Sequence, residues 1–201
     1  MERKMPSMMM QMQTPQDLFL HELGDIYDAE QRIVQMLPAM AKECMDQQTQ
    51  SAFQQHEQET RQQIQNLEQC FQALGIQPPQ VTCAAIQGLK QEHDSFLKDQ
   101  PSDVVLTLFD LDSATKTEYY EIASYAGLIE KAQMMGQRQC ASLLQQNLQQ
   151  EQAMAQQVQQ LEQRLGQQAM RVGSMGQQSM PGQQPMPGQQ PMSGQQPMTR
   201  P

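Results

Sequence analysis

The chain of 201 residues contains no tryptophan, and only 4 % of its residues are aromatic. β-branched residues are sparse as well. These two groups are the ones that favour strands, so their scarcity argues against a sheet. The composition therefore predicts an all-α protein.

Positive charge is also scarce. Thirteen lysine and arginine residues stand against 22 aspartate and glutamate residues, which gives a net charge of −9 and a pI near 4.7. We find no basic cluster that could neutralise the phosphates of a nucleic acid, so we expect no nucleic-acid partner. No apolar run approaches about 18 residues, so we expect no membrane-spanning helix.

The four cysteines are far apart and form no C-x-x-C pair, unlike the ligands of a zinc site built on paired cysteines. Nothing resembles a signal peptide, because the Met8–Met10 run is short and glutamine and threonine follow it. We therefore expect a cytoplasmic protein whose reduced thiols act as small buried hydrophobes. The cysteines are Cys44, Cys70, Cys83 and Cys140.

Glutamine, by contrast, is abundant. It is a good helix former without charge, so it can make a solvated helix face without lysine or glutamate. Near the end of the chain, residues 181–198 repeat PGQQPM twice and then SGQQPM, a composition that cannot build a core. We predict a disordered leader at residues 1–13, one domain at 14–166 and a disordered tail at 167–201.

Apolar spacing predicts four long helices within that domain. Thr14 and Pro15 suit the start of the first, and Asp46 can cap the second. Gly75 and Gly136 are natural residues to follow the second and third. The expected helices cover about residues 15–45, 47–74, 102–135 and 137–165.

The long segment 76–101 separates the second and third helices, and its apolar residues suggest a short extra helix. Two helical hairpins joined by a long crossover are the connection of ferritin-like bundles. The expected fold is therefore an all-α, ferritin-like four-helix bundle with a short helix in the crossover.

Acidic residues interrupt the apolar faces of these helices. Glu118 and Glu121 are three residues apart, so they share one helix face, and a buried carboxylate needs a partner. The separations from Glu30 to Glu59 and from Glu121 to Glu151 are 29 and 30 residues, so two hairpins would bring these acids to one level. The candidate metal ligands are Glu30, His56, Glu59, Glu118, Glu121 and Glu151.

Carboxylates and imidazole suit iron, manganese or zinc, and two divalent ions would offset so many acids. We expect tyrosines beside the ligands to hydrogen-bond them. The competing interpretation is that these glutamates lie on solvated helix faces, as we expect for Glu22, His21 and His93. The tyrosines are Tyr27, Tyr119, Tyr120 and Tyr125.

Residues 14–31 (TPQDLFLHELGDIYDAEQ) resemble the opening of the bacterial YciE/YciF family of ferritin-like stress-response proteins. Three further blocks continue the resemblance in order, at residues 37–41 (LPAMA), 56–60 (HEQET) and 118–123 (EYYEIA). The resemblance covers about residues 14–165. It implies a four-helix ferritin-like bundle and a homodimer.

By residue, the resemblance implies that Glu30, His56, Glu59, Glu121 and Glu151 are ligands. The chain departs from the family pattern at Tyr119, where histidine is common, and at Gln150, where a second acid is frequent. It also lacks an acid at residues 154–156. The fourth helix therefore offers fewer ligands than a full di-iron site needs.

The favoured function is a stress-response protein with a dinuclear iron or manganese site that reacts with oxygen or peroxide. The first alternative is a metal-free bundle with a structural or interaction role, and a hollow iron-storage cage is a weaker one. The methionine-rich ends suggest Cu(I) binding or an oxidant sink as separate ideas.

Overall fold

The computed structural model describes residues 12–178, with the side chains of residues 12–171, and this part of the chain is helical without strands. Most of the predicted leader lies outside it, as do residues 179–201 of the predicted tail and the methionine repeat. The helices are α1 (Pro15–Glu43), α2 (Gln47–Leu74), α3 (Ala84–Phe96), α4 (Asp103–Met134) and α5 (Arg138–Gln178), with a 3₁₀ turn at Leu97–Asp99.

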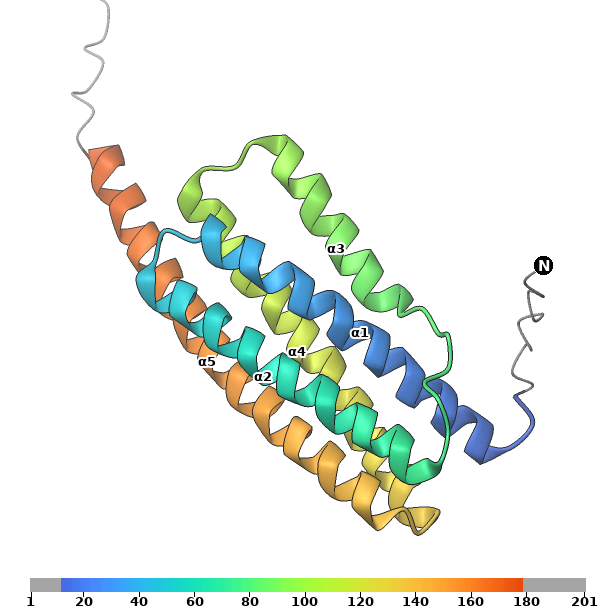
Figure 1. Cartoon of the computed structure of the whole chain (residues 1–201). Coiled ribbons are helices and arrows are strands. Elements are labelled where there is room, and N and C mark those ends of the chain that lie inside the picture. The colour runs from blue at the N-terminus through green and yellow to red at the C-terminus, as the bar shows by residue number, and fades with distance from the viewer. Residues whose placement is uncertain (1–11, 179–201) are drawn as a thin grey trace, which may run out of the picture.

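The long helices form two antiparallel hairpins, α1 with α2 and α4 with α5, which pack into a four-helix bundle (Figure 1). Only three residues join the helices within each hairpin, at 44–46 and 135–137. The remaining helix, α3, lies outside the bundle along α1 and contacts both α1 and α4. The predicted ferritin-like connection with a short crossover helix is confirmed.

The predicted helix starts follow from local capping. The Thr14 hydroxyl accepts a hydrogen bond from the Asp17 N–H at 3.1 Å, and the Asp17 carboxylate accepts one from the Thr14 N–H at 2.8 Å. This reciprocal pair satisfies two N–H groups that the first helical turn leaves unpaired. At the start of α2 the cap is one-sided, and the Asp46 carboxylate accepts a hydrogen bond from the Thr49 N–H at 2.9 Å.

The predicted ends are corrected in two places. α1 ends at Glu43 rather than near Met45, although Pro38 inside it does not end it. α5 continues through Gly166 to Gln178, well past the expected end at Leu165. Glycine only weakens a helix, and no proline follows Gly166 before Pro181, so the good helix formers around it carry the helix on.

The bundle core is formed by apolar side chains from all four long helices. Its largest fully buried members include Tyr125, Phe19, Phe53 and Phe71. All four cysteines are free and at most 1 % exposed, as expected for small buried hydrophobes.

The position of α3 corrects one expectation. His93 was expected at the surface, but only 7 % of it is exposed. α3 packs against α1 and α4, and this contact turns the histidine inward. The helix periodicity of a crossover segment cannot show which face will find a partner.

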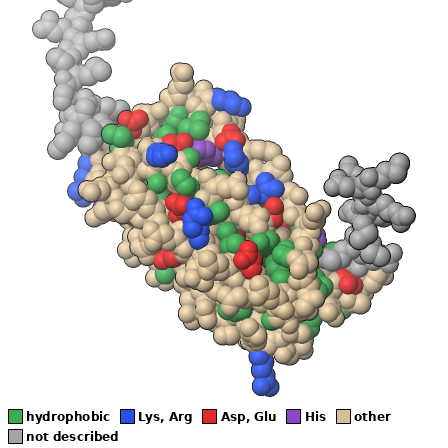
Figure 2. Space-filling model, viewed as in Figure 1, with side chains coloured by type: hydrophobic (Ala, Val, Ile, Leu, Met, Phe, Trp, Pro, Cys, Tyr) green, Lys and Arg blue, Asp and Glu red, His purple; other side chains and the backbone are tan. Residues whose placement is uncertain are grey.

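Backbone and side chains that are neither hydrophobic nor charged cover much of the face in Figure 2, and acidic and basic side chains are interspersed on it. That face carries no continuous basic area. Within the described residues, we find no helix that is both long enough and apolar enough to cross a membrane.

The crossover passes closely over α1 at Gly24, which is fully packed. A Cβ atom at this position would lie 2.6 Å from Cγ of Pro79 and 3.0 Å from Cγ2 of Val81. We expect Gly24→Ala to lower the free energy of unfolding by about 1–3 kcal/mol, because the rigid proline ring has to move. Chemical denaturation measures this change.

Gly88→Ala in α3 is the matched control, because a Cβ atom there meets nothing within 4 Å. It should raise stability by up to about 1 kcal/mol through helix propensity alone. If both variants are stabilised equally, the crossover does not pack on α1 as described.

Candidate metal centre

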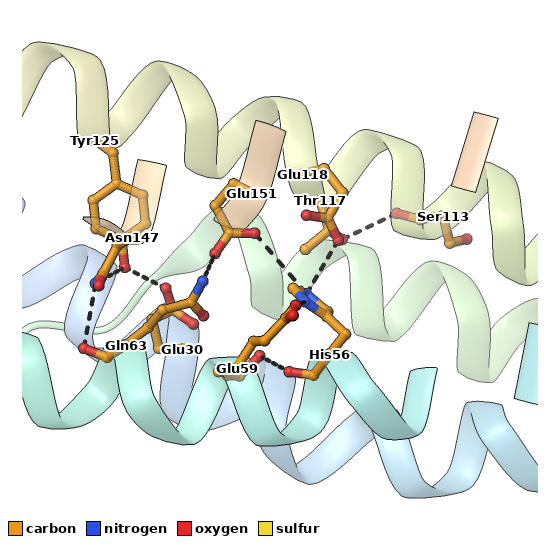
Figure 3. A network of polar contacts seen from close by, with 11 residues as sticks. Glu30, His56, Glu59, Gln63, Ser113, Thr117, Glu118, Tyr125, Asn147 and Glu151 are labelled. Atoms are coloured by element: carbon orange, nitrogen blue, oxygen red, sulfur yellow. Dashed lines mark hydrogen bonds and ion pairs between the residues drawn. The ribbon is translucent and has the colours of Figure 1, made fainter. Parts of the chain in front are cut away.

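Each of the four bundle helices brings ionisable side chains to the middle of the core. The helical period places these positions on the inward faces, between apolar residues. Figure 3 shows Glu30, His56, Glu118 and Glu151 extending from different helices toward one another. α1 supplies Glu30, α2 supplies His56 and Glu59, α4 supplies Glu118 and Glu121, and α5 supplies Glu151.

Four of the six predicted side chains form a tight group. One donor atom from each of His56, Glu118, Glu121 and Glu151 lies within 4.8 Å of the others. Nε2 of His56 is 3.2 Å from Oε1 of Glu118 and 4.0 Å from Oε2 of Glu151. None of the four is more than 1 % exposed, so water does not compensate their charges.

Glu30 adjoins this group at the end away from His56. It is fully buried, and its charge acts on the nearby carboxyl group of Glu121. The Tyr125 hydroxyl donates to Oε1 of Glu30, and Nδ2 of Asn147 donates to that hydroxyl at 3.0 Å. Gln63 donates to Oε1 of Glu151 (Figure 3). At this end, uncharged donors therefore give hydrogen bonds to one oxygen of Glu30 and one oxygen of Glu151.

The structure places Glu59 at the edge of the group rather than inside it. Its side chain is 27 % exposed, and its Oε2 lies 3.7 Å from Nδ1 of His56. Its other oxygen accepts a hydrogen bond from Gln55 at 2.8 Å. Glu59 therefore faces the outer nitrogen of the imidazole, whereas the inner nitrogen faces the carboxylates.

Many polar atoms in this core have no hydrogen-bond partner. Both ring nitrogens of His56 and both oxygens of Glu121 are unpaired, together with Oε2 of Glu30, Glu118 and Glu151. A buried unpaired polar group costs free energy, and a buried unpaired charge costs far more. Carboxylate oxygens and imidazole nitrogens are the donors that iron, manganese and zinc prefer, so the residues fit a metal site.

In the metal-free chain, protons have to neutralise part of this charge. Burial raises the pKa of Glu30 to about 7. Burial and the neighbouring carboxylates Glu151 and Glu30 raise the pKa of Glu121 well above its usual range, and burial also raises that of Glu151. Burial alone would lower the pKa of His56, but the neighbouring carboxylates of Glu118, Glu59 and Glu151 together outweigh burial and raise that pKa well above its usual range.

Sequence reasoning gave the amides of this core no role in the site. Gln63 and Asn147 are each fully buried, four residues from Glu59 and Glu151 respectively. Their helical spacing from the acids was the available signal. On glutamine-rich helices, that signal does not separate an inward amide from the many solvated ones.

The expectation for the tyrosines is confirmed only for Tyr125. The hydroxyl of Tyr27 donates to Glu68 at 3.1 Å, and that of Tyr120 donates to Asp25. Tyr119 is 53 % exposed and accepts a hydrogen bond from Gln159 at 3.0 Å. On α4, Tyr125 is four residues from Glu121 and shares its face, whereas Tyr120 is adjacent to Glu121 and points in a different direction.

These pKa shifts give the metal-free protein a defined pH dependence. Groups with a raised pKa in the fold bind more protons folded than unfolded, so their stabilising contribution is lost as the pH rises. This sign holds for Glu30, Glu121, Glu151 and His56 alike. With a chelator present, we expect the melting temperature to fall by about 5 °C or more between about pH 6 and about pH 8.

Glu121→Gln should reduce this fall, because the amide remains neutral throughout. Glu130→Gln, at an exposed position on the same helix, should leave the fall unchanged. Equal pH profiles for the two variants would show that Glu121 does not titrate in the buried state described.

Comparison with known proteins supports this fold and identifies the family. A family described as a domain of unknown function, DUF892, matches residues 14–171. Protein YciF of Escherichia coli (strain K12) is 32 % identical over 145 residues, which is 72 % of this chain and 87 % of that protein.

Solved structures of similar proteins share the arrangement. The E. coli stress protein YciF is 29 % identical with a TM-score of 0.74, over 78 % of this chain and 99 % of that chain. YcfI from Rhodopseudomonas palustris is 36 % identical with a TM-score of 0.71, over 74 % of this chain and 94 % of that one. A protein from Xanthomonas campestris pv. campestris, 21 % identical with a TM-score of 0.61, shares the fold. The match over residues 14–171, together with the YciF similarity, establishes that the chain belongs to the DUF892 family.

Proposed function

We propose that this chain is a stress-response protein whose bundle core holds two divalent metal ions, iron or manganese, and that it reacts with oxygen or peroxide. Zinc also suits the donors. The observation that carries the proposal is the set of buried, unpaired carboxylate and imidazole atoms that four helices bring together. Cations neutralise such a set without requiring protons on it.

The donors divide along the bundle. His56, Glu118, Glu121 and Glu151 would hold metal at one end, and Glu30 with Glu121 and Glu151 would extend the set toward Tyr125. Glu59 completes the proposed ligand set from the edge, next to the outer nitrogen of His56. When bound, redox-active ions supply the electrons and the Lewis acidity that reduction of oxygen or peroxide requires.

The protein itself would restrict access to the centre, admit one small molecule and hold a proton. A cavity of about 20 Å³ borders His56 and Glu118, and its other walls include Ile33, Leu37 and Ala114. This volume suits one molecule of the size of water. At the opposite end, the Tyr125 hydroxyl holds a proton directed at Glu30.

The biological setting is also a proposal. E. coli YciF, to which this chain is similar, is described as a stress protein. We extend that role to this chain, as a cytoplasmic homodimer without a nucleic-acid or membrane partner. Light scattering of the full chain should give a dimer mass, whereas a mass near that of a cage would favour iron storage instead.

A second candidate is a metal-free bundle with a structural or interaction role in stress. The donors from Gln63, Tyr125 and Asn147 favour it, because they satisfy one end of the carboxylate group without a cation. Protons on the carboxylates with raised pKa values would complete the compensation.

Metal analysis of Glu121→Ala separates the two candidates. For a metal protein, we expect about two equivalents of iron or manganese per wild-type chain after anaerobic loading, and a loss of most of it in the variant. The variant should also lose the stability added by metal, which is about 2.7 kcal/mol at a hundredfold excess over Kd. Elemental analysis and thermal unfolding measure both.

Glu130→Gln, exposed on the same helix, should keep the wild-type metal content. For a metal-free bundle, wild type binds less than a tenth of an equivalent. Glu121→Ala then has a mild or even stabilising effect, because it removes a buried carboxyl group whose two oxygens have no hydrogen-bond partner.

A further inference from the structure

A second group of metal-binding side chains lies where the crossover helix meets the bundle. Glu43 is the last residue of α1, His93 is in the last turn of α3, and Asp110 is in the first half of α4. One donor atom from each lies within 4.8 Å of the others. None of the three belongs to the candidate metal centre.

The three donor atoms converge on one point. Nε2 of His93 is 3.0 Å from Oε2 of Glu43 and 3.2 Å from Oδ1 of Asp110. A ring nitrogen carries at most one hydrogen, so a metal-free imidazole cannot give both carboxylates a well-directed hydrogen bond. The hydrogen bond goes to Glu43 at 3.0 Å.

Asp110 is left incompletely paired. The residue is fully buried, yet its Oδ1 has no hydrogen-bond partner and points at the imidazole. Its other oxygen accepts only a weak bond from the Cys44 thiol, with the sulfur at 3.8 Å. Such an atom costs free energy unless a cation or a donor reaches it.

The outer side of the His93 imidazole has two neighbours. Its outer nitrogen, Nδ1, lies 3.9 Å from Oδ1 of Asp94, and the other oxygen of Asp94, Oδ2, lies 2.6 Å from Nζ of Lys90. The ring of Phe109 lies beside the imidazole with the centroids 6.2 Å apart.

A route from solvent reaches the group. A groove of about 370 Å³ between α1 and α3 is lined by Glu43 and His93, among others. Two cationic residues on it, Arg32 and Lys90, are each paired with an aspartate four residues away. Their charges are thus offset, and a cation can approach.

We propose that Glu43, His93 and Asp110 bind one divalent transition-metal ion of the zinc, iron or manganese class, at a site separate from the centre in the bundle core. One imidazole and two carboxylates suit these ions, and three protein ligands leave a position for water. The bound ion would join α3 to α1 and α4 and so fasten the crossover to the bundle.

Zinc binding to full-length chains tests this site. The parent is Glu121→Ala, in which the proposed core centre is disabled. Calorimetric titration with Zn²⁺ should give about one tight site per parent chain, and Glu43→Gln or Asp110→Asn should weaken it about tenfold or more. Glu92→Gln, exposed on α3 next to His93, is the matched control and should leave binding unchanged.

Two features keep the test decisive. If Asp110→Asn does not fold, Glu43→Gln still tests zinc binding. The Glu43 side chain is 25 % exposed and the substitution is isosteric, so we expect this variant to fold. Zinc should also slow amide hydrogen exchange in α3 of the parent, but not in Glu43→Gln.

The proposal is overturned if the parent binds no zinc, or if Glu43→Gln and Asp110→Asn bind it as the parent does. A protonated His93 between two carboxylates would then account for the contacts. This site shares no ligand with the core centre. The proposal for it therefore stands even if wild type carries no metal in the core. In the same way, the core centre remains possible if this site binds no zinc.

Discussion

A carboxylate buried in an apolar core has to be neutralised, and here this constraint acts on several carboxylates at once. Glu30, Glu121 and Glu151 are each fully buried in a space shared by four helices. Water cannot reach them, so protons, hydrogen-bond donors or cations have to compensate the charge. The arrangement of side chains around them is best understood as a combination of these three means.

The compensation is asymmetric along the bundle. Toward one end, the Tyr125 hydroxyl and the amides of Gln63 and Asn147 supply neutral donors. Toward the other end, His56 faces Glu118 and Glu151 with both ring nitrogens unpaired. The protein therefore completes one end with its own side chains and leaves the other open to a cation. The crossover helix α3 creates a second arrangement of this kind, in which the imidazole of His93 faces the carboxylates of Glu43 and Asp110 from two other helices.

The helix starts and the level of the acidic residues could be predicted from the sequence, because local capping chemistry and the helical period determine them. Thr14 and Asp46 cap the helices where expected. The spacing of the acids brings them to one level because three-residue turns keep the helices of each hairpin in step. The fold could be predicted as well. The 26-residue crossover at 76–101 between two hairpins is compatible with few bundle connections, and the ferritin-like one is among them.

The remainder depends on the rotation of each helix about its axis and on its tertiary neighbours. Periodicity placed Glu59 on the inward side of α2 but could not show that it would face the outer nitrogen of His56. Neither could it show that α3 would bury His93, since only the packing of α3 on the bundle does so. At Gly166 the sequence carries a residue that often follows helices, but nothing nearby competes with continuing the helix.

The glutamine-rich helix faces have a consequence for the response of the protein to its surroundings. Charged residues make up 17 % of the chain, whereas about 25 % is usual for soluble domains. Dissolved ions act on a surface mainly by screening its charges, and an amide offers them little to screen. Osmotic changes that concentrate or dilute the surrounding electrolyte therefore alter the surface free energy of this bundle less than that of a charge-rich bundle of equal length.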